Sequence, residues 1–195
     1  MTPTYQGYQV TTANADLPIT MEMVRAHLRL DDITSEDALV QSYLLAAASY
    51  VEKTYGIALL TQTIKEYHAG FPDDDNVGIN LRISPVLSIT SVKYIDSNGT
   101  EQTWSNTLYT SGIVRQTAFV IPKQNQSWPQ SQTLPNSVVI EYQAGFGDGP
   151  AFIPTAIKQA LLLMVGDMDS KREDNVIQLP RASELLLAPW YRFSS

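Results

Sequence analysis

The sequence contains no cysteine and only two histidines, His27 and His68. The lack of cysteine excludes disulfide bonds, zinc–thiolate sites and cysteine nucleophiles. With two histidines, the chain has few side chains that commonly act as general acids or bases near neutral pH. The longest apolar run, residues 160–165, is far shorter than the roughly 20 residues that cross a bilayer. These absences remove several common classes of active site and indicate no membrane segment.

Charge is also scarce and unbalanced. Charged residues make up 17% of the chain, with 13 Lys and Arg against 20 Asp and Glu, so the formal net charge is 13 − 20 = −7. An acidic surface repels phosphate, so we expect no electrostatic binding to nucleic acid of the kind driven by counterion release. Residues 1–16 show no basic cluster followed by an apolar run. The sequence therefore predicts no signal or transit peptide and a cytosolic-type product.

The spacing of apolar residues changes twice along the chain of 195 residues. Helical spacing predicts helices over 20–30, 35–55 and 154–170, with Thr20 as an N-cap, Gly56 as a stop, and the last helix central. Between the second and third of these helices, apolar residues alternate with a period of two, which predicts a β region. Asn98-Gly99 is expected to form a hairpin turn within it, with positive φ at both central positions.

These patterns predict an α+β fold: a small helical bundle of three main helices plus a short C-terminal element, with an inserted, mainly antiparallel β region. We expect one structural unit overall. Its stretches are an extended N-terminal arm at 1–18 that only a partner or neighbour orders, a helical part at 19–58, a β insertion at 59–143, a central helix with a charged end at 144–179, and a C-terminal docking segment at 180–195.

No catalytic, metal or cofactor site emerges from the motifs. Neither histidine has a convincing partner: we expect a structural role for His27 and a solvated strand edge for His68. The acidic run at 73–75 lacks the glycine and distal glutamate of a calcium loop, so a solvated turn is favoured. The glycines at 145, 147 and 149 lack the spacing of a nucleotide-binding fingerprint, which favours a strand-to-helix link.

The C-terminal segment is the strongest candidate for binding. It carries three consecutive leucines and residue types that dominate binding hot spots. The candidate residues are Leu185, Leu186, Leu187, Trp190, Tyr191 and Arg192. Composition alone supports equally well a segment that folds back on the protein's own core and one that docks on a partner.

Several short motifs, in this order, resemble one family. They are AHLRLD at 26–31, AAASYVE at 46–52, LLTQT at 59–63, SPVLSI at 84–89, YIDSNG at 94–99, SWP at 127–129, AGFG at 144–147 and LLAPWYR at 186–192. The chain resembles the head-to-tail connector (adaptor) family of long-tailed bacteriophages over residues 18–192, in particular its larger members with a β insertion.

The resemblance implies a non-enzymatic virion protein without cofactors. It implies a homo-oligomeric ring, usually a dodecamer, beneath the portal of the DNA-filled head, where DNA passes through the channel without specific binding. Its partners are the portal protein, contacted by the C-terminal segment, and a stopper or tail-completion protein on the opposite side. The resemblance places the protein in the virion neck, after synthesis in the host cytoplasm, with no membrane contact.

Two alternatives come from other functional classes. A monomeric ligand- or carbohydrate-binding β module could use Trp104, Trp128 and the many tyrosines to stack on sugars. A hydrolase would need a paired-carboxylate cleft, which Glu66 and Asp96 could supply only if the fold brought them together.

Overall fold

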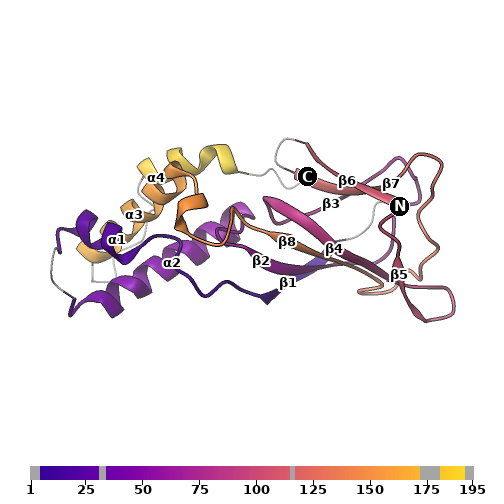
Figure 1. Cartoon of the computed structure of the whole chain (residues 1–195), viewed down its shortest axis with the longest axis horizontal. Coiled ribbons are helices and arrows are strands. Elements are labelled where there is room, and N and C mark those ends of the chain that lie inside the picture. The colour runs from indigo at the N-terminus through magenta and orange to yellow at the C-terminus, as the bar shows by residue number, and fades with distance from the viewer. Residues whose placement is uncertain (1–4, 31–33, 115–116, 172–180, 192–195) are drawn as a thin grey trace. The chain divides into compact units, whose positions relative to one another are not determined.

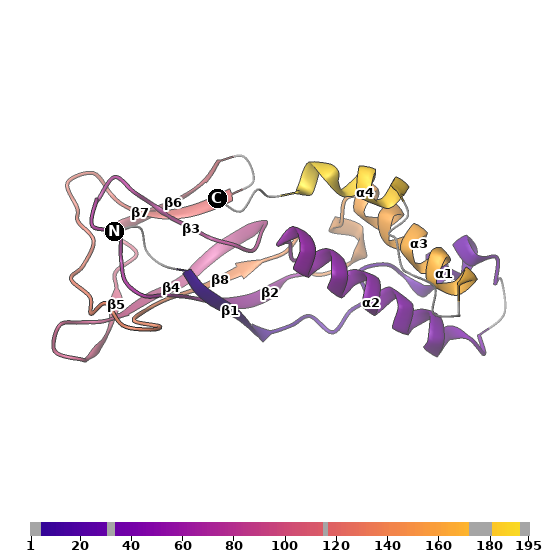
Figure 2. The same cartoon turned by 180° about the vertical axis from the view of Figure 1, so that it is seen from behind.

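The computed structural model describes residues 5–30, 34–114, 117–171 and 181–191. The chain divides into two compact units, Met1–Asn14 with Thr61–Gly145, and Ala15–Leu60 with Phe146–Ser195. We call the first the β unit and the second the helical unit; Figures 1 and 2 show their elements. Two units appear where we expected one structural unit, because the β region buries an apolar core of its own. No described helix is long and apolar enough to cross a membrane.

The helical unit consists of helices alone among its described elements. They are α1 (Met21–Leu28), α2 (Asp37–Tyr55), the 3-10 helix η1 (Pro150–Phe152), α3 (Thr155–Ser170), α4 (Arg181–Leu187) and the 3-10 helix η2 (Ala188–Trp190). The Thr20 hydroxyl accepts a hydrogen bond from the Met23 N–H at 3.4 Å, which confirms the predicted N-cap of α1. Gly56 follows α2 with φ 62°, the left-handed conformation that glycine adopts without strain. The helices α1, α2 and α3 therefore lie where the apolar spacing predicts helices.

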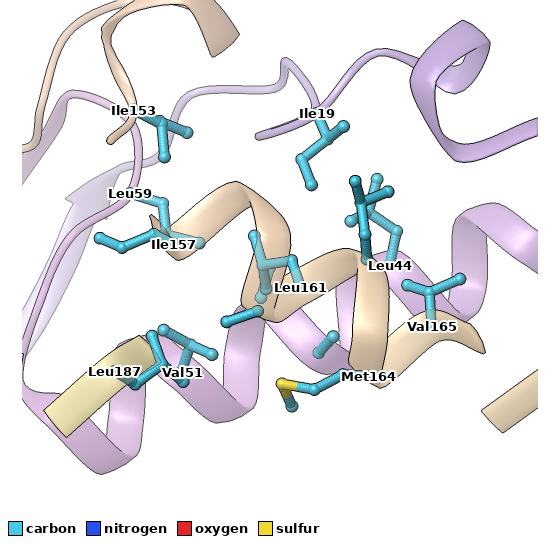
Figure 3. Packing of buried hydrophobic residues seen from close by; sticks show 14 of the residues in the cluster. Ile19, Leu44, Val51, Leu59, Ile153, Ile157, Leu161, Met164, Val165 and Leu187 are labelled. Atoms are coloured by element: carbon cyan, nitrogen blue, oxygen red, sulfur yellow. The ribbon is translucent and has the colours of Figure 1, made fainter. Parts of the chain in front are cut away.

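The core of the helical unit lies between α2 and α3, as Figure 3 shows. Both helices bury the residues of their apolar stripes. Fully buried side chains include Val40, Leu44 and Val51 of α2, and Ile157, Leu161 and Val165 of α3. Because α3 packs against α1, α2 and α4, it is the central helix, as predicted.

The prediction of three main helices with a short C-terminal element is wrong. The described residues contain four α-helices, because Arg181–Leu187 forms α4. Leu187 is fully buried in the core, and the Ser183 hydroxyl donates a hydrogen bond to the Ala160 carbonyl of α3 at 3.3 Å. A helix this short is marginal in isolation, so its packing against α3 stabilises it. The mixed α and β character of the fold is as expected.

The β unit contains two antiparallel sheets. The larger has the strand order β1-β2-β8-β4-β5 and the smaller β3-β7-β6. The strands are β1 (Tyr5–Thr12), β2 (Gln62–His68), β3 (Ile79–Asn80), β4 (Val86–Ile95), β5 (Glu101–Trp104), β6 (Tyr109–Val114), β7 (Thr117–Pro122) and β8 (Val138–Ala144). In Figures 1 and 2 the smaller sheet lies above the larger one within this unit.

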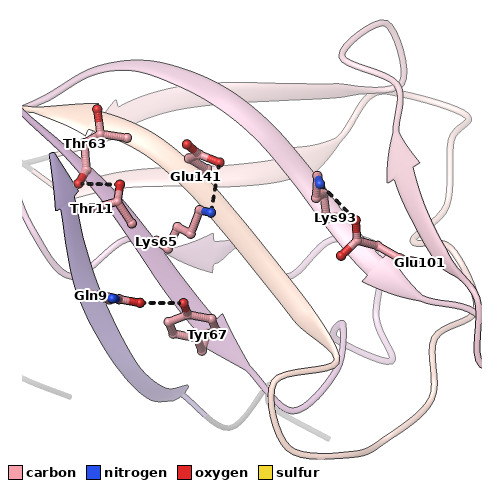
Figure 4. Close-up of polar contacts among 8 residues, drawn as sticks. All are labelled: Gln9, Thr11, Thr63, Lys65, Tyr67, Lys93, Glu101 and Glu141. Atoms are coloured by element: carbon pink, nitrogen blue, oxygen red, sulfur yellow. Dashed lines mark hydrogen bonds and ion pairs between the residues drawn. The ribbon is translucent and has the colours of Figure 1, made fainter.

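The expectation that residues 1–18 need a partner to become ordered is wrong. Residues 5–12 form β1, which pairs antiparallel with β2. The Thr11 hydroxyl donates to the Thr63 carbonyl at 3.2 Å and the Tyr67 hydroxyl donates to Gln9 at 3.2 Å (Figure 4). Most β1 side chains are exposed on both faces. The strand therefore has no alternating pattern to reveal it and depends on backbone pairing instead.

The turn at Asn98-Gly99 joins β4 to β5, but its geometry differs from the expected one. Gly99 has φ 81°, whereas Asn98 is not among the residues with positive φ. The Asp96 carboxylate accepts hydrogen bonds from the backbone N–H groups of Asn98 and Thr100 at 2.9 and 3.0 Å. Hydrogen bonds to the carboxylate, first that from the Thr100 backbone and next that from the Gln102 side chain, hold the pKa of Asp96 below its ordinary value. Asp96 thus closes the turn.

Replacing Leu44 by alanine is expected to lower the free energy of unfolding of the helical unit by about 2–5 kcal/mol, because it leaves a cavity beside α3. Leu45→Ala, at the next, exposed position of the same helix, is the matched control and should cost about 0.5 kcal/mol or less. Urea unfolding followed by far-UV circular dichroism measures both values. Equal losses would contradict the burial of Leu44.

Candidate docking segment and buried polar cluster

The C-terminal segment presents two different faces. Leu187 is fully buried in the core of the helical unit, and Leu186 and Trp190 pack against that core. The Trp190 ring meets the edge of Phe146 with ring centroids 5.2 Å apart. These three residues fold back on the protein's own core, which was one of the two possibilities left open by the sequence.

The other face of this segment points to solvent. Leu185 is 68% exposed and Tyr191 is 56% exposed. The Tyr191 ring rests edge-on against Tyr55 at 6.2 Å, which fixes its position on the surface. Arg192 lies outside the described residues. We call Leu185 and Tyr191 the C-terminal docking surface; they are the described candidate residues that a partner could cover.

A buried polar cluster that the sequence analysis missed lies in the β unit. Glu66 is fully buried and His68 is 2% exposed. The Glu66 Oε2 atom accepts hydrogen bonds from the Arg82 backbone N–H and from the Tyr142 hydroxyl, both at 2.9 Å. The Tyr142 oxygen in turn accepts a hydrogen bond from the Ile83 N–H at 3.2 Å. The carboxylate therefore links two strands of the larger sheet, β2 and β8, to the segment that follows β3.

His68 completes this cluster. Its Nε2 atom lies 3.2 Å from Glu66 Oε1, although the contact lacks hydrogen-bond geometry. Tyr5 of β1 packs edge-on against the imidazole, with ring centroids 5.9 Å apart. The expectation of an unpartnered His68 at a solvated strand edge is therefore wrong. A signal was available, because Ile64, Glu66 and His68 alternate and so share one face of a strand.

Protonation of the tyrosine hydroxyl keeps the cluster together. Burial, and after it the neighbouring Glu66 carboxylate, raises the pKa of Tyr142 above its ordinary value. The hydroxyl therefore keeps its proton and donates a hydrogen bond to Glu66 at any ordinary pH. Since both Glu66 and His68 are buried, the pair is inaccessible to a substrate in solution and acts as a structural contact.

His27 has a separate structural environment in the helical unit. It is half-buried on α1 and packs where Gly166 of α3 has no side chain. A Cβ atom at position 166 would lie 3.3 Å from His27 Nε2, so the glycine allows the two helices to approach closely.

The carboxylate pair of the hydrolase alternative is not assembled. Glu66 lies opposite Ile140, which lies opposite Val92, and Asp96 follows four residues further along the chain. Two strand spacings and four residues separate the two Cα atoms by about 16 Å. The Glu66 carboxylate is bound to Tyr142 in the buried cluster and the Asp96 carboxylate to the turn backbone, so the two do not form the facing pair that a glycosidase needs.

The tryptophans of the sugar-binding alternative are buried in an aromatic cluster. Phe71 stacks on Trp128 at 5.0 Å, and Trp104 lies 5.1 Å from Trp128 and 5.0 Å from Tyr109. Both tryptophans are buried. Their faces therefore pack against other rings and offer no platform for a sugar.

The acidic run also has structural partners. Asp74 accepts hydrogen bonds from Asn76, and Asp75 accepts one from the Trp128 backbone N–H at 2.8 Å. Asp75 thereby ties the polar loop around Trp128 to this turn. In the part of the chain that the structure describes, no group of three or more His, Asp or Glu side chains could hold a metal ion.

The comparisons with known proteins agree with the resemblance drawn from the motifs. The family model of the phage gp6-like head-tail connector protein matches residues 18–110. No curated protein matches the chain.

Solved structures match almost the whole chain. One describes the virion of a native gene transfer agent (GTA) particle, with 23% identity and a TM-score of 0.80. Two others describe the neck of the empty GTA particle computed with C6 symmetry, with 24% identity and a TM-score of 0.80, and the neck of the native GTA particle computed with C12 symmetry, with 22% identity and a TM-score of 0.74. Each match covers 97% of both chains. At this identity they establish the fold.

Replacing Glu66 by alanine is expected to destabilise the β unit, because the Tyr142 hydroxyl and the Arg82 N–H lose their buried acceptor. Each unsatisfied group costs about 1–3 kcal/mol. Glu66→Gln keeps an acceptor oxygen and should lose less. Glu101→Ala, which removes a carboxylate that is exposed on β5, should cost under about 1 kcal/mol. Denaturant unfolding followed by tryptophan fluorescence measures all three, and an unchanged midpoint for Glu66→Ala would contradict the role of the cluster.

Replacing Leu187 by alanine is expected to cost about 2–5 kcal/mol of folding stability, because its side chain fills the core. Leu185→Ala, two residues earlier and exposed, should change stability by about 0.5 kcal/mol or less. Thermal unfolding of the two variants tests the assignment of the two faces. The assignment fails if Leu185→Ala is the more destabilised variant.

Proposed function

The family model of the phage gp6-like head-tail connector protein matches residues 18–110, and from this match we propose that the chain is the structural adaptor between a virion's DNA-filled head and its tail. The family match is the observation that carries the proposal. The likeness of the whole fold to chains of GTA virion and neck structures supports it independently. The protein acts as a building block of the neck and catalyses no reaction.

In this role the chain forms a closed ring beneath the portal. Identical subunits encircle a channel when a head-to-tail contact repeats by a rotation that closes. The C6 and C12 symmetries of the similar neck structures support a ring, and we propose twelve subunits. A net charge of −7 suits a channel through which DNA passes without being held.

The C-terminal segment docks on the portal protein. Leu185 and Tyr191 make the contact from the exposed face of the segment, while Leu186, Leu187 and Trp190 anchor it to the helical unit. The opposite side of the ring meets the stopper or tail-completion protein. The subunit is made in the host cytoplasm and becomes part of the virion neck.

Catalysis has no support in the described residues. Glu66 and His68, the one close acid–histidine pair among the contacts described above, are both buried. Neither the hydrolase nor the sugar-binding alternative gains an observation in its favour.

The double variant Leu185→Glu/Tyr191→Ala is expected to fold normally and to lose binding to portal-containing heads. Loss of hot-spot contacts costs at least about 2 kcal/mol, or roughly thirtyfold in affinity. Co-sedimentation of the purified protein with heads measures the binding, and circular dichroism checks the fold. Leu134→Glu, a similarly exposed leucine in the β unit, is the control and should bind like wild type. Undiminished binding by the double variant would place the portal contact elsewhere.

A further inference from the structure

The two sheets of the β unit have four edge strands. The larger sheet ends at β1 and β5, and the smaller sheet ends at β3 and β6. An edge strand presents unpaired backbone N–H and C=O groups that can pair with a strand of another chain. Proteins usually prevent such pairing by short edges or by charged side chains. The four edge strands differ in length and in whether they carry charged side chains.

Two of the edges are protected. Strand β3 has two residues and β5 has four. Strand β5 also begins with the exposed Glu101, whose carboxylate pairs with Lys93 of β4 at 2.9 Å (Figure 4). Shortness and charge therefore disfavour strand addition at β3 and β5.

No described strand borders the outer edge of either remaining strand, β1 or β6, and we call these two edges open. Strand β1 has eight residues and β6 has six, and neither contains a charged residue. Tyr8 and Val10 of β1 are 40% and 39% exposed. The inner edge of β1 is taken by β2, whereas no described strand borders its outer edge. Two long, uncharged edges in one chain of net charge −7 are positions where copies can approach without like-charge repulsion.

The open edges lie on opposite sides of the β unit. Arg82, which follows β3, places its guanidinium 4.8 Å from the centre of the Tyr5 ring of β1. Trp104 of β5 and Tyr109 of β6 have ring centroids 5.0 Å apart. The segment that follows β3 therefore reaches β1, and the start of β6 lies beside the end of β5. A head-to-tail ring requires two different surfaces on opposite sides of the subunit, and β1 and β6 meet this requirement.

We infer that the outer edge of β1 in one copy pairs with the outer edge of β6 in the next copy, so that strand addition joins neighbouring subunits of the ring. The occupant of each open edge is a second copy of this chain, because one chain supplies both edges. Six residues of β6 give a pairing about 20 Å long. This inference rests on the proposed function and names the surface through which the ring closes.

The absence of cysteine makes a direct test possible. Gln9→Cys on β1 is combined with Thr110→Cys or with Ser111→Cys on β6, and heads carrying the assembled protein are treated with a mild oxidant. Disulfides form when Cα atoms lie about 4.4–6.8 Å apart. The expected result is a ladder of covalent multimers on a non-reducing gel for at least one pair. Gln9→Cys with Gln102→Cys on β5 is the matched control and should give no ladder.

Electron microscopy of the same heads separates the two proposals. Rings at the neck with no ladder from either β1–β6 pair, or with a ladder from the β1–β5 control, overturn the inference and leave the proposed function standing. Heads without any ring of this protein overturn both. A second variant, Tyr8→Lys/Val10→Lys, should fold normally and lose ring assembly, whereas Gln102→Lys should assemble. Normal rings from Tyr8→Lys/Val10→Lys overturn the inference as well.

Discussion

The buried Glu66 carboxylate is the contact on which the β unit depends. It accepts hydrogen bonds from Tyr142 and from the Arg82 backbone, and so connects the larger sheet to the segment after β3. That segment continues the smaller sheet, because the Leu81 N–H donates to the Ala118 carbonyl of β7 at 2.8 Å. A buried carboxylate is costly unless its hydrogen bonds are satisfied. The two sheets are therefore held in one arrangement by the need to satisfy a single acid.

The helical unit depends on an apolar contact instead. Leu187 enters the core beside α3, and this burial positions a helix of seven residues that would not persist alone. The same contact divides the C-terminal segment into an inner face and an outer face. The residues that hold the segment on the core thus lie next to Leu185 and Tyr191, the residues that we propose for docking.

Polar and uncharged surfaces carry the proposed assembly. In the proposed ring, a subunit with net charge −7 would meet identical neighbours, and charged contact surfaces of one sign would oppose this. Backbone hydrogen bonds along open strands provide a contact that needs neither charge nor a large apolar patch. The exposed Leu185 and Tyr191 of the C-terminal segment offer apolar and aromatic side chains to the proposed portal contact, and aromatic residues are enriched in the cores of protein interfaces.

The sequence by itself determined the helices α1, α2 and α3, the mixed α and β character and the resemblance to the connector family, because apolar spacing and motif order are local properties of the chain. Only the tertiary structure decided the rest. Strand β1 has no alternating pattern, and α4 is too short to form without the core. Glu66 and His68 are buried together because the strand face that carries them is buried. Leu187 is buried and Leu185 exposed because α4 packs against α3. The alternation of Ile64, Glu66 and His68 places these residues on one strand face. The burial of that face, the pairing of β1 and the packing of α4 depend on contacts between residues distant in sequence, which local patterns do not encode.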